Sequence, residues 1–201
     1  GRSADSINRK IADRIKTGFG LTDEEYARMT PQQATDSLLA RKNRDPQTAR
    51  LPYDLRFHGE IRQCGKVTSL RCTVYTLTGG AHGLLTNLFF NFDTESGKPL
   101  DKADLFSDTA GLQRLNRQYF AKHLSDAALS EDALFVGTDQ LPLPENVGID
   151  SSGVTMLYNP YEVAPYAIGT IEYRIPYEQA EPLLKPPVAT ARPDDIKTNK
   201  H

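Results

Sequence analysis

The first fifty residues carry apolar side chains at helical spacing. Within residues 4–17 an isoleucine stands at every fourth position with charged residues between, which predicts a helix with one apolar face (Ile7, Ile11, Ile15). Gly18 and Gly20 predict its end. Thr22 with Glu25 has the spacing of a capping box and predicts a short second helix.

A third helix is predicted to begin at Thr30, because Pro31 and Gln33 complete a capping box with proline at the first helical position. Its apolar residues are Ala34, Leu38 and Leu39. From Leu51 the period changes to two, which predicts antiparallel strands over residues 53–64 and 67–78 around a turn at Gly65, and a third strand over 84–92.

The second half of the chain repeats the change from helix to strand. Asp108 is expected to cap a helix of about 16 residues whose apolar side holds Leu112, Leu115, Tyr119 and Leu124. VGID and VTMLY then predict a hairpin across residues 151–153, and residues 170–175 predict a last strand. Pro176 fits the first position of a closing helix ending near Leu184, and residues 186–201 predict a disordered tail.

This order predicts an α+β fold of mostly antiparallel sheets with helices packed on them. We expect two lobes, residues 1–100 with the first helices and three strands, and residues 101–185 with the remaining helix and strands. Strands and helices do not alternate regularly, which disfavours a doubly wound nucleotide-binding fold.

Composition narrows the function classes. The 201 residues hold 24 Lys and Arg against 26 Asp and Glu, so the basic surface typical of nucleic-acid binders is not expected. No apolar run approaches the roughly 20 residues of a membrane helix. The chain starts with Gly1 and a polar segment, from which we expect that an upstream segment was removed. Oligomeric state cannot be read from these features.

Two cysteines, Cys64 and Cys72, are too few for a disulfide framework, and their spacing matches no zinc motif. If Gly65 and Lys66 form the turn of a hairpin, Cys72 lies opposite Gly59, and a bridge to Cys64 has poor geometry. The sequence therefore predicts two buried or half-buried thiols.

The segment TGGAHG, residues 78–83, combines three glycines with His82. Glycines allow a sharp turn that presents the imidazole at a strand edge. We favour a turn in which His82 bonds to backbone, and a His82 that faces a ligand or acts in catalysis is the alternative. The segment lacks the Lys and Ser/Thr of a phosphate-binding loop.

The segment YNPYEVAPYAIG, residues 158–169, holds two prolines that remove backbone donors, so it predicts a structured loop. Tyr158, Tyr161 and Tyr166 surround Glu162 there. Rigid tyrosines suit a sugar ring or a protein partner. The competing interpretations are that the tyrosines pack the loop against the sheet, or that Glu162 is catalytic.

Other chemistry is not indicated. The sequence has no HExxH, CxxC or GxSxG motif and no acidic calcium loop, so we expect no metal and no cofactor. An acidic series follows the third strand, and solvated helix and turn caps explain it better than metal ligands (Asp93, Glu95, Asp101, Asp104, Asp108).

Three segments together resemble a known family: INRKI, YTLTGGAHG with NLFFNFDTESGKPLDKADLF, and SSGVTMLYNPYEVAPYAIGTIEYRIPY. They are similar to the extracytoplasmic domain of unknown function that RsiV-type anti-sigma factors carry. The same type of domain lies on the amino-terminal side of the polysaccharide deacetylase PdaC. The resemblance spans roughly residues 1–185. Its motif positions are Gly79, Gly80, Ala81, His82 and Gly83, then Tyr161, Glu162, Ala164, Pro165, Tyr166 and Gly169.

The resemblance implies a two-lobed α+β domain that is exported to the periplasm or cell surface, often as a lipoprotein or on a membrane anchor. In RsiV-type proteins the domain binds lysozyme. We therefore expect a noncatalytic binding or sensor domain that recognises a lysozyme-like protein or a peptidoglycan fragment through Tyr158, Tyr161, Glu162 and Tyr166, with His82 as a further candidate. An envelope hydrolase using Glu162 and His82, and a purely structural role for both motifs, are the alternatives.

Overall fold

Helix α1 (Arg2–Gly18) opens the chain in the computed structural model, which describes residues 2–186. A short 3-10 helix (Glu24–Tyr26) and helix α2 (Pro31–Arg44) follow. The predicted capping box at Thr30 is confirmed, because its hydroxyl accepts from Gln33 N and the Gln33 side chain accepts from Thr30 N. The box predicted at Thr22 is wrong: Asp23 is the N-cap of the short helix, without a side-chain hydrogen bond.

A four-stranded sheet has the order β1-β2-β3-β4. The bounds of β1 (Tyr53–Cys64) and β2 (Val67–Thr78) are those that the period-two pattern predicts, and β3 (Leu84–Asp93) is one residue longer than predicted. The two-residue strand β4 (Pro99–Leu100) was not predicted. It is too short to show a period.

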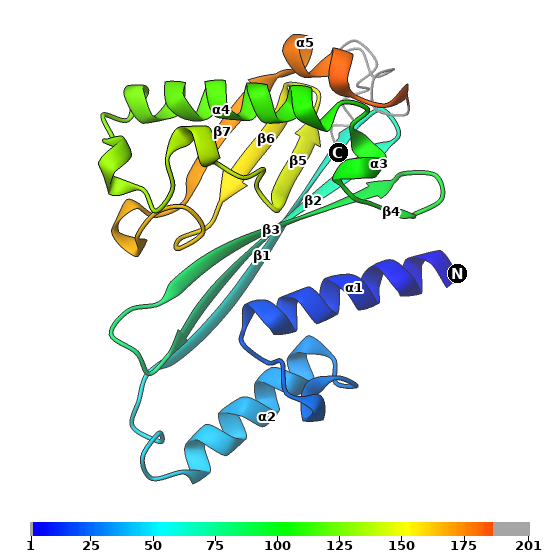
Figure 1. Ribbon diagram of the computed structural model, residues 1–201. Coiled ribbons are helices and arrows are strands. Elements are labelled where there is room, and N and C mark those ends of the chain that lie inside the picture. The colour runs from blue at the N-terminus through cyan, green and yellow to red at the C-terminus, as the bar shows by residue number, and fades with distance from the viewer. Residues whose placement is uncertain (1, 187–201) are drawn as a thin grey trace, which may run out of the picture. The chain divides into compact units, whose positions relative to one another are not determined.

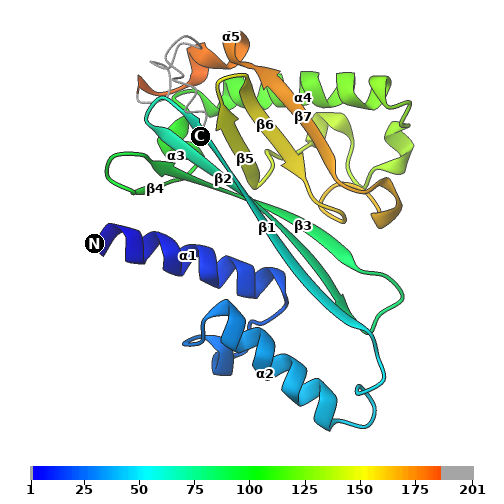
Figure 2. The ribbon, with the colours of Figure 1, turned by 180° about the vertical axis from the view of Figure 1, so that it is seen from behind.

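A second, three-stranded sheet has the order β5-β6-β7. It contains the predicted hairpin, β5 (Asn146–Asp150) and β6 (Gly153–Tyr158), with Asp150 opposite Gly153, and the last strand β7 (Ile171–Pro176). Helix α4 (Thr109–Asp126) packs across one face of this sheet (Figure 1). The opposite face of the same sheet is turned toward the viewer in Figure 2. The predicted α+β class with antiparallel sheets is confirmed.

Short elements complete the chain. Helix α3 (Lys102–Leu105) precedes α4, and two 3-10 helices follow it (Glu131–Ala133, Thr138–Gln140). Another lies between β6 and β7 (Tyr166–Ile168). The predicted closing helix is divided into α5 (Tyr177–Ala180) and a 3-10 turn (Glu181–Leu183), because Pro182 has no N–H to continue an α-helical ladder. Residues 187–201 of the predicted tail lie outside the described residues.

The described residues belong to two compact units, which we describe separately. Unit 1 is drawn from Gly1–Gly59 and Cys72–Leu88, and unit 2 from Glu60–Arg71 and Phe89–His201. Each unit combines segments from separate parts of the chain, whereas the predicted lobes, 1–100 and 101–185, follow the chain order. Strands β1, β2 and β3 contribute residues to both units.

In unit 1, Ile15 on the apolar face of α1 is buried, and so are residues of the segments that follow (Phe19, Leu21, Tyr26, Ala34, Val74). Lys16 is also buried, and its Nζ donates to the carbonyls of Tyr26 at 3.0 Å and Ala27 at 3.1 Å. A buried ammonium needs such acceptors. Among the described residues, no helix of either unit is long and apolar enough to cross a membrane.

In unit 2, an aromatic group holds α4 on the sheet. Phe120 of α4 meets Tyr158 and Tyr173 edge-on, with ring centroids 5.7 and 5.9 Å away. Asn116, fully buried on the same helix, donates from Nδ2 to the Tyr158 hydroxyl at 2.9 Å and accepts from the Tyr173 hydroxyl at 2.6 Å. The polar tips of the buried tyrosines are thereby satisfied.

Candidate functional site

The proline-rich loop after β6 is pinned by its own backbone. Tyr161 N donates to Ala164 O at 3.0 Å, and Glu162 N donates to Asn159 O at 3.1 Å. Val163 and Ala164 are buried and anchor the centre of the loop. The loop is therefore ordered by local hydrogen bonds and by two apolar anchors, as its prolines predict.

Tyr161 stands on this anchored loop with its ring directed to solvent. Its side chain is 54% exposed, and its ring centroid lies 5.8 Å from that of Tyr166, with an angle of 30° between the rings. Its φ of +73° is unusual for a residue with a bulky side chain. Strain of this kind persists only where the surrounding structure imposes it, and it concentrates at binding sites.

Phe135 extends the exposed aromatic area. Its N–H donates to Val163 O at 2.9 Å, which places residue 135 next to the loop, and its side chain is 57% exposed. We call Phe135, Tyr161 and Tyr166 the aromatic surface. Sequence reasoning missed Phe135, because it lies in another segment with no strand or helix pattern of its own.

Tyr158 does not belong to this surface. Its ring is 1% exposed, and its hydroxyl donates to Pro142 O at 2.6 Å in the core. Burial raises its pKa to about 12, although hydrogen bonds to Asn116 and Tyr173 oppose the shift. Tyr158 is the last residue of β6, a strand in which all six residues are buried, so its side chain lies in the core and not on the loop surface. The prediction that Tyr158 contacts a ligand has to be corrected accordingly.

Acidic residues predominate in the chain segments that carry the aromatic surface. No Lys or Arg occurs between Lys122 and Arg174, and this stretch holds eight carboxylates: Asp126, Glu131, Asp132, Asp139, Glu145, Asp150, Glu162 and Glu172. Six of them, all except Asp150 and Glu172, are exposed. The 3-10 helix that carries Glu131 and Asp132 ends two residues before Phe135. The charge pattern was available in the sequence and is the signal that would have marked this region.

Glu162 shows the effect of these neighbours. Glu162 is exposed as a residue, but its carboxylate is partly shielded from water, and this desolvation is the main cause that raises its pKa. The charge of Glu145 adds to the increase, while hydrogen bonds from Asn159 and the charge of Lys102 act in the other direction. Its Oε1 accepts from Asn159 Nδ2 at 3.1 Å. Lys102 is itself bound to Pro144 O at 2.9 Å and to Glu145 at 3.5 Å.

The glycine-rich turn with His82 lies in unit 1. Gly79 has a φ of +83° and donates from N to Pro52 O at 2.9 Å. A side chain at Gly83 would start only 2.3 Å from the ring of Tyr75. These two glycines therefore serve the turn and the packing against Tyr75.

His82 is exposed, and its Nδ1 lies 3.2 Å from Gly83 O, as expected for the backbone-bonded turn. Tyr75 also lines an open groove of about 400 Å³ in unit 1, together with Arg56, Phe57, His58, Thr73 and Leu85. His82 and Glu162 belong to different units, so the structure does not assemble the acid–base pair of the hydrolase alternative within either unit.

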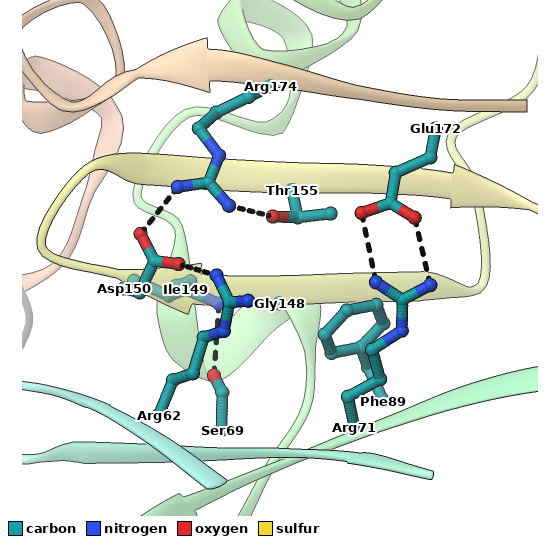
Figure 3. Close-up of a pocket in the computed structure, with 10 residues that line it drawn as sticks. All are labelled: Arg62, Ser69, Arg71, Phe89, Gly148, Ile149, Asp150, Thr155, Glu172 and Arg174. Atoms are coloured by element: carbon teal, nitrogen blue, oxygen red, sulfur yellow. Dashed lines mark hydrogen bonds and ion pairs between the residues drawn. The ribbon is translucent and has the colours of Figure 1, made fainter. Parts of the chain in front are cut away.

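A charged cluster in unit 2 is the other conspicuous polar feature (Figure 3). Asp150 accepts from Arg62 at 2.8 Å and from Arg174 at 3.0 Å, and Arg71 binds both oxygens of Glu172 at 3.0 and 2.9 Å. Burial would raise the pKa of Asp150. Hydrogen bonds from Ser152 and Arg62 and the charge of Arg174 outweigh that effect and lower it.

This cluster is filled by its own side chains. The space remaining among the residues in Figure 3 is about 10 Å³, roughly what one water needs. Ser69 Oγ accepts from Ile149 N at 2.9 Å, and Asn91 Nδ2 donates to Val147 O at 2.8 Å, so β2 and β3 are bonded to β5 here. The cluster joins the strands of unit 2 and offers no room for a substrate.

Four members of the acidic series are turn or helix caps, as predicted, whereas Glu95 pairs with Lys66 at 3.1 Å. Asp93 accepts from Ser96 N at 2.7 Å, Asp101 caps α3 by accepting from Asp104 N at 2.8 Å, and Asp108 caps α4 by accepting from Gly111 N at 2.8 Å. Within residues 2–186, no three His, Cys, Asp or Glu side chains are grouped so that they could hold a metal ion.

Part of the chain is similar to a family that has been recognised in other proteins. Residues 103–178, which include α4, β5–β7 and the proline-rich loop, match the model of a family described as "Protein of unknown function (DUF3298)". No protein with curated annotation matches the chain. The expected similarity to a domain of unknown function is thus confirmed for this stretch, and the RsiV-type assignment stays a prediction.

Two solved structures share the fold. A DUF3298 family protein from Bacteroides fragilis has a TM-score of 0.59 and 22% identity, over 90% of this chain and 79% of its own. One from Pseudomonas aeruginosa has a TM-score of 0.63 and 20% identity, over 89% of this chain and 79% of its own. At these identities the likeness concerns the fold.

Proposed function

We propose that the protein is a noncatalytic binding domain of the cell envelope that recognises a basic, lysozyme-like protein through the aromatic surface. One observation carries the proposal: the exposed, conformationally strained Tyr161 lies beside Tyr166, with the rings tilted by 30°, on a pinned loop in a stretch of the chain rich in exposed carboxylates. The envelope location rests on the resemblance to RsiV-type domains.

The chemistry of the surface favours a protein partner with positive charge. Tyrosine and phenylalanine rings held on an ordered loop lose little conformational entropy on binding, and such residues dominate the energy of protein interfaces. Carboxylates around them attract basic partners and speed association. A neutral peptidoglycan fragment could stack on the rings but would gain little from the exposed carboxylates.

Calorimetry with hen egg-white lysozyme and with purified muropeptides tests the proposal. We expect lysozyme to bind, and we expect Tyr161→Asn combined with Tyr166→Ala to weaken that binding by at least about tenfold. Asparagine is chosen at position 161 because it tolerates a positive φ. Leu84→Ala, which removes an exposed apolar side chain in unit 1, is the matched control and should leave the affinity unchanged.

The contribution of the exposed carboxylates can be measured separately, in the rate of association. Glu145→Gln with Glu162→Gln should slow association and reduce its dependence on salt, with little effect on dissociation. Binding of muropeptides but not of lysozyme would transfer the site to a glycan. Absence of binding to both, or binding that is indifferent to the loop variants, would contradict the proposal.

A further inference from the structure

Strand β1 has one long side without a neighbouring strand. It stands at the end of the order β1-β2-β3-β4, and within the described residues nothing is paired to its outer side. It has 12 residues and is one continuous strand, although residues up to Gly59 are assigned to unit 1 and the rest to unit 2. Residues 56–63 are all exposed, including Ile61 at 71% and Phe57 at 45%. A long exposed edge is a template for another strand.

The charges along this edge alternate in sign. The even-numbered residues read, in order, acidic, basic, histidine, acidic and basic: Asp54, Arg56, His58, Glu60 and Arg62. They lie on one face, as side chains two apart in a strand do, and Arg56 pairs with Asp54 at 3.0 Å and Arg62 with Glu60 at 3.0 Å. Such a series is its own complement when it is reversed.

We propose that β1 pairs antiparallel with β1 of a second copy of the chain, about a two-fold axis through His58. In this register Asp54 lies opposite Arg62 of the second copy, and Arg56 lies opposite its Glu60. Both contacts occur twice because of the symmetry, so four pairs of opposite charge flank the two histidines. A two-fold interface of this kind is closed and stops at the dimer.

The backbone and the other face fit the same register. Residues of equal parity oppose each other, so the N–H and C=O groups that point outward from one copy meet those of the other. On the odd-numbered face, Phe57 covers Gly59 of the second copy, and Leu55 meets its Ile61. Aromatic rings stabilise glycines opposite them in this way. The pairing thus covers the exposed Phe57 and Ile61.

Neighbouring registers lack this complementarity. An axis moved to Phe57 sets Asp54 against Glu60, and an axis moved to Gly59 sets Arg56 against Arg62. Like charges directly opposite each other destabilise a sheet. Charge alone therefore selects His58 as the centre.

Sedimentation velocity on charge-swap variants tests the interface. The protein should form dimers, and Glu60→Arg or Arg56→Glu alone should weaken dimerisation roughly tenfold or more, because each sets like charges opposite one another twice. An equimolar mixture of the two variants should recover dimers, since every facing pair then has opposite signs. Lys122→Glu, a charge reversal on α4, should have no effect.

A crosslink tests the register itself. Opposite residues in an antiparallel pair have Cβ atoms about 5 Å apart, within disulfide reach, so His58→Cys should form a covalent dimer on mild oxidation. Arg56→Cys should not, because the two positions would lie about 14 Å apart. The native thiols are buried and should stay out of the reaction.

A loss of dimers is informative only for a variant that is folded. Melting curves of each variant show whether it is folded before its association is compared. A monomeric wild-type chain at all concentrations would overturn the proposal. So would single charge variants that dimerise like the wild type, or equal crosslinking at positions 56 and 58.

Discussion

Asp150 shows how a single residue joins the strands of unit 2. Its side chain is 11% exposed and accepts from two guanidinium groups, so removal of its charge leaves Arg62 and Arg174 without their shared partner. We expect Asp150→Asn to lower the free energy of unfolding by about 2 kcal/mol in urea denaturation at neutral pH. Asp126→Asn, which removes an exposed pair with Lys122, should change it by about 0.5 kcal/mol or less.

The pH dependence of this effect has a definite sign. The pKa of Asp150 is lower in the folded than in the unfolded chain, so its contribution is present above the ordinary value of about 4 and is lost as the pH falls through the folded pKa. The difference in stability between the wild type and Asp150→Asn should therefore shrink below about pH 4. A constant difference down to the acid transition would contradict the assigned role.

At the scale of elements, helix α2 allows a test of capping. Thr30 forms both hydrogen bonds of a capping box, whereas Thr22 precedes a helix whose N-cap is Asp23. Thr30→Ala should destabilise the protein by about 1 kcal/mol, and Thr22→Ala by a few tenths at most. Thermal or urea unfolding followed by circular dichroism compares the two. Equal losses would show that the box at Thr30 contributes nothing specific.

The same two threonines illustrate what sequence can predict. Both have the capping-box spacing, and only the structure distinguishes them, because a cap depends on the local φ and ψ that packing selects. The long strands β1 and β2 follow from their period alone. Elements of two to four residues, such as β4 and α3, leave no period to read.

The candidate site divides in the same way. The prolines predict an ordered loop, but they do not predict which tyrosine faces solvent: Tyr158 ends a strand and is buried, whereas Tyr161 lies in a turn and is exposed. Phe135 joins the site through one backbone hydrogen bond across a sequence gap. Contacts of that kind depend on tertiary folding and have no local signature.

At the scale of the whole molecule, the two cysteines are natural reporters of the two units. Cys72 belongs to unit 1 and Cys64 to unit 2, both are buried without a disulfide, and burial raises the pKa of each thiol to about 11. Neither should react with a thiol reagent in the native protein at pH 8, because the thiolate is the nucleophile. Reaction therefore measures opening of the surrounding structure.

We expect Cys72 to react at lower urea concentration than Cys64. The large cluster of buried apolar residues, with Phe120, Tyr158 and Tyr173 at its centre, lies in unit 2, and Cys64 is part of it. Unit 1 buries fewer large side chains, and regions with less buried apolar area open at lower free energy. Pulsed alkylation with mass spectrometry assigns the label to each cysteine without any substitution. Simultaneous labelling at every urea concentration would show instead that the two units unfold as one.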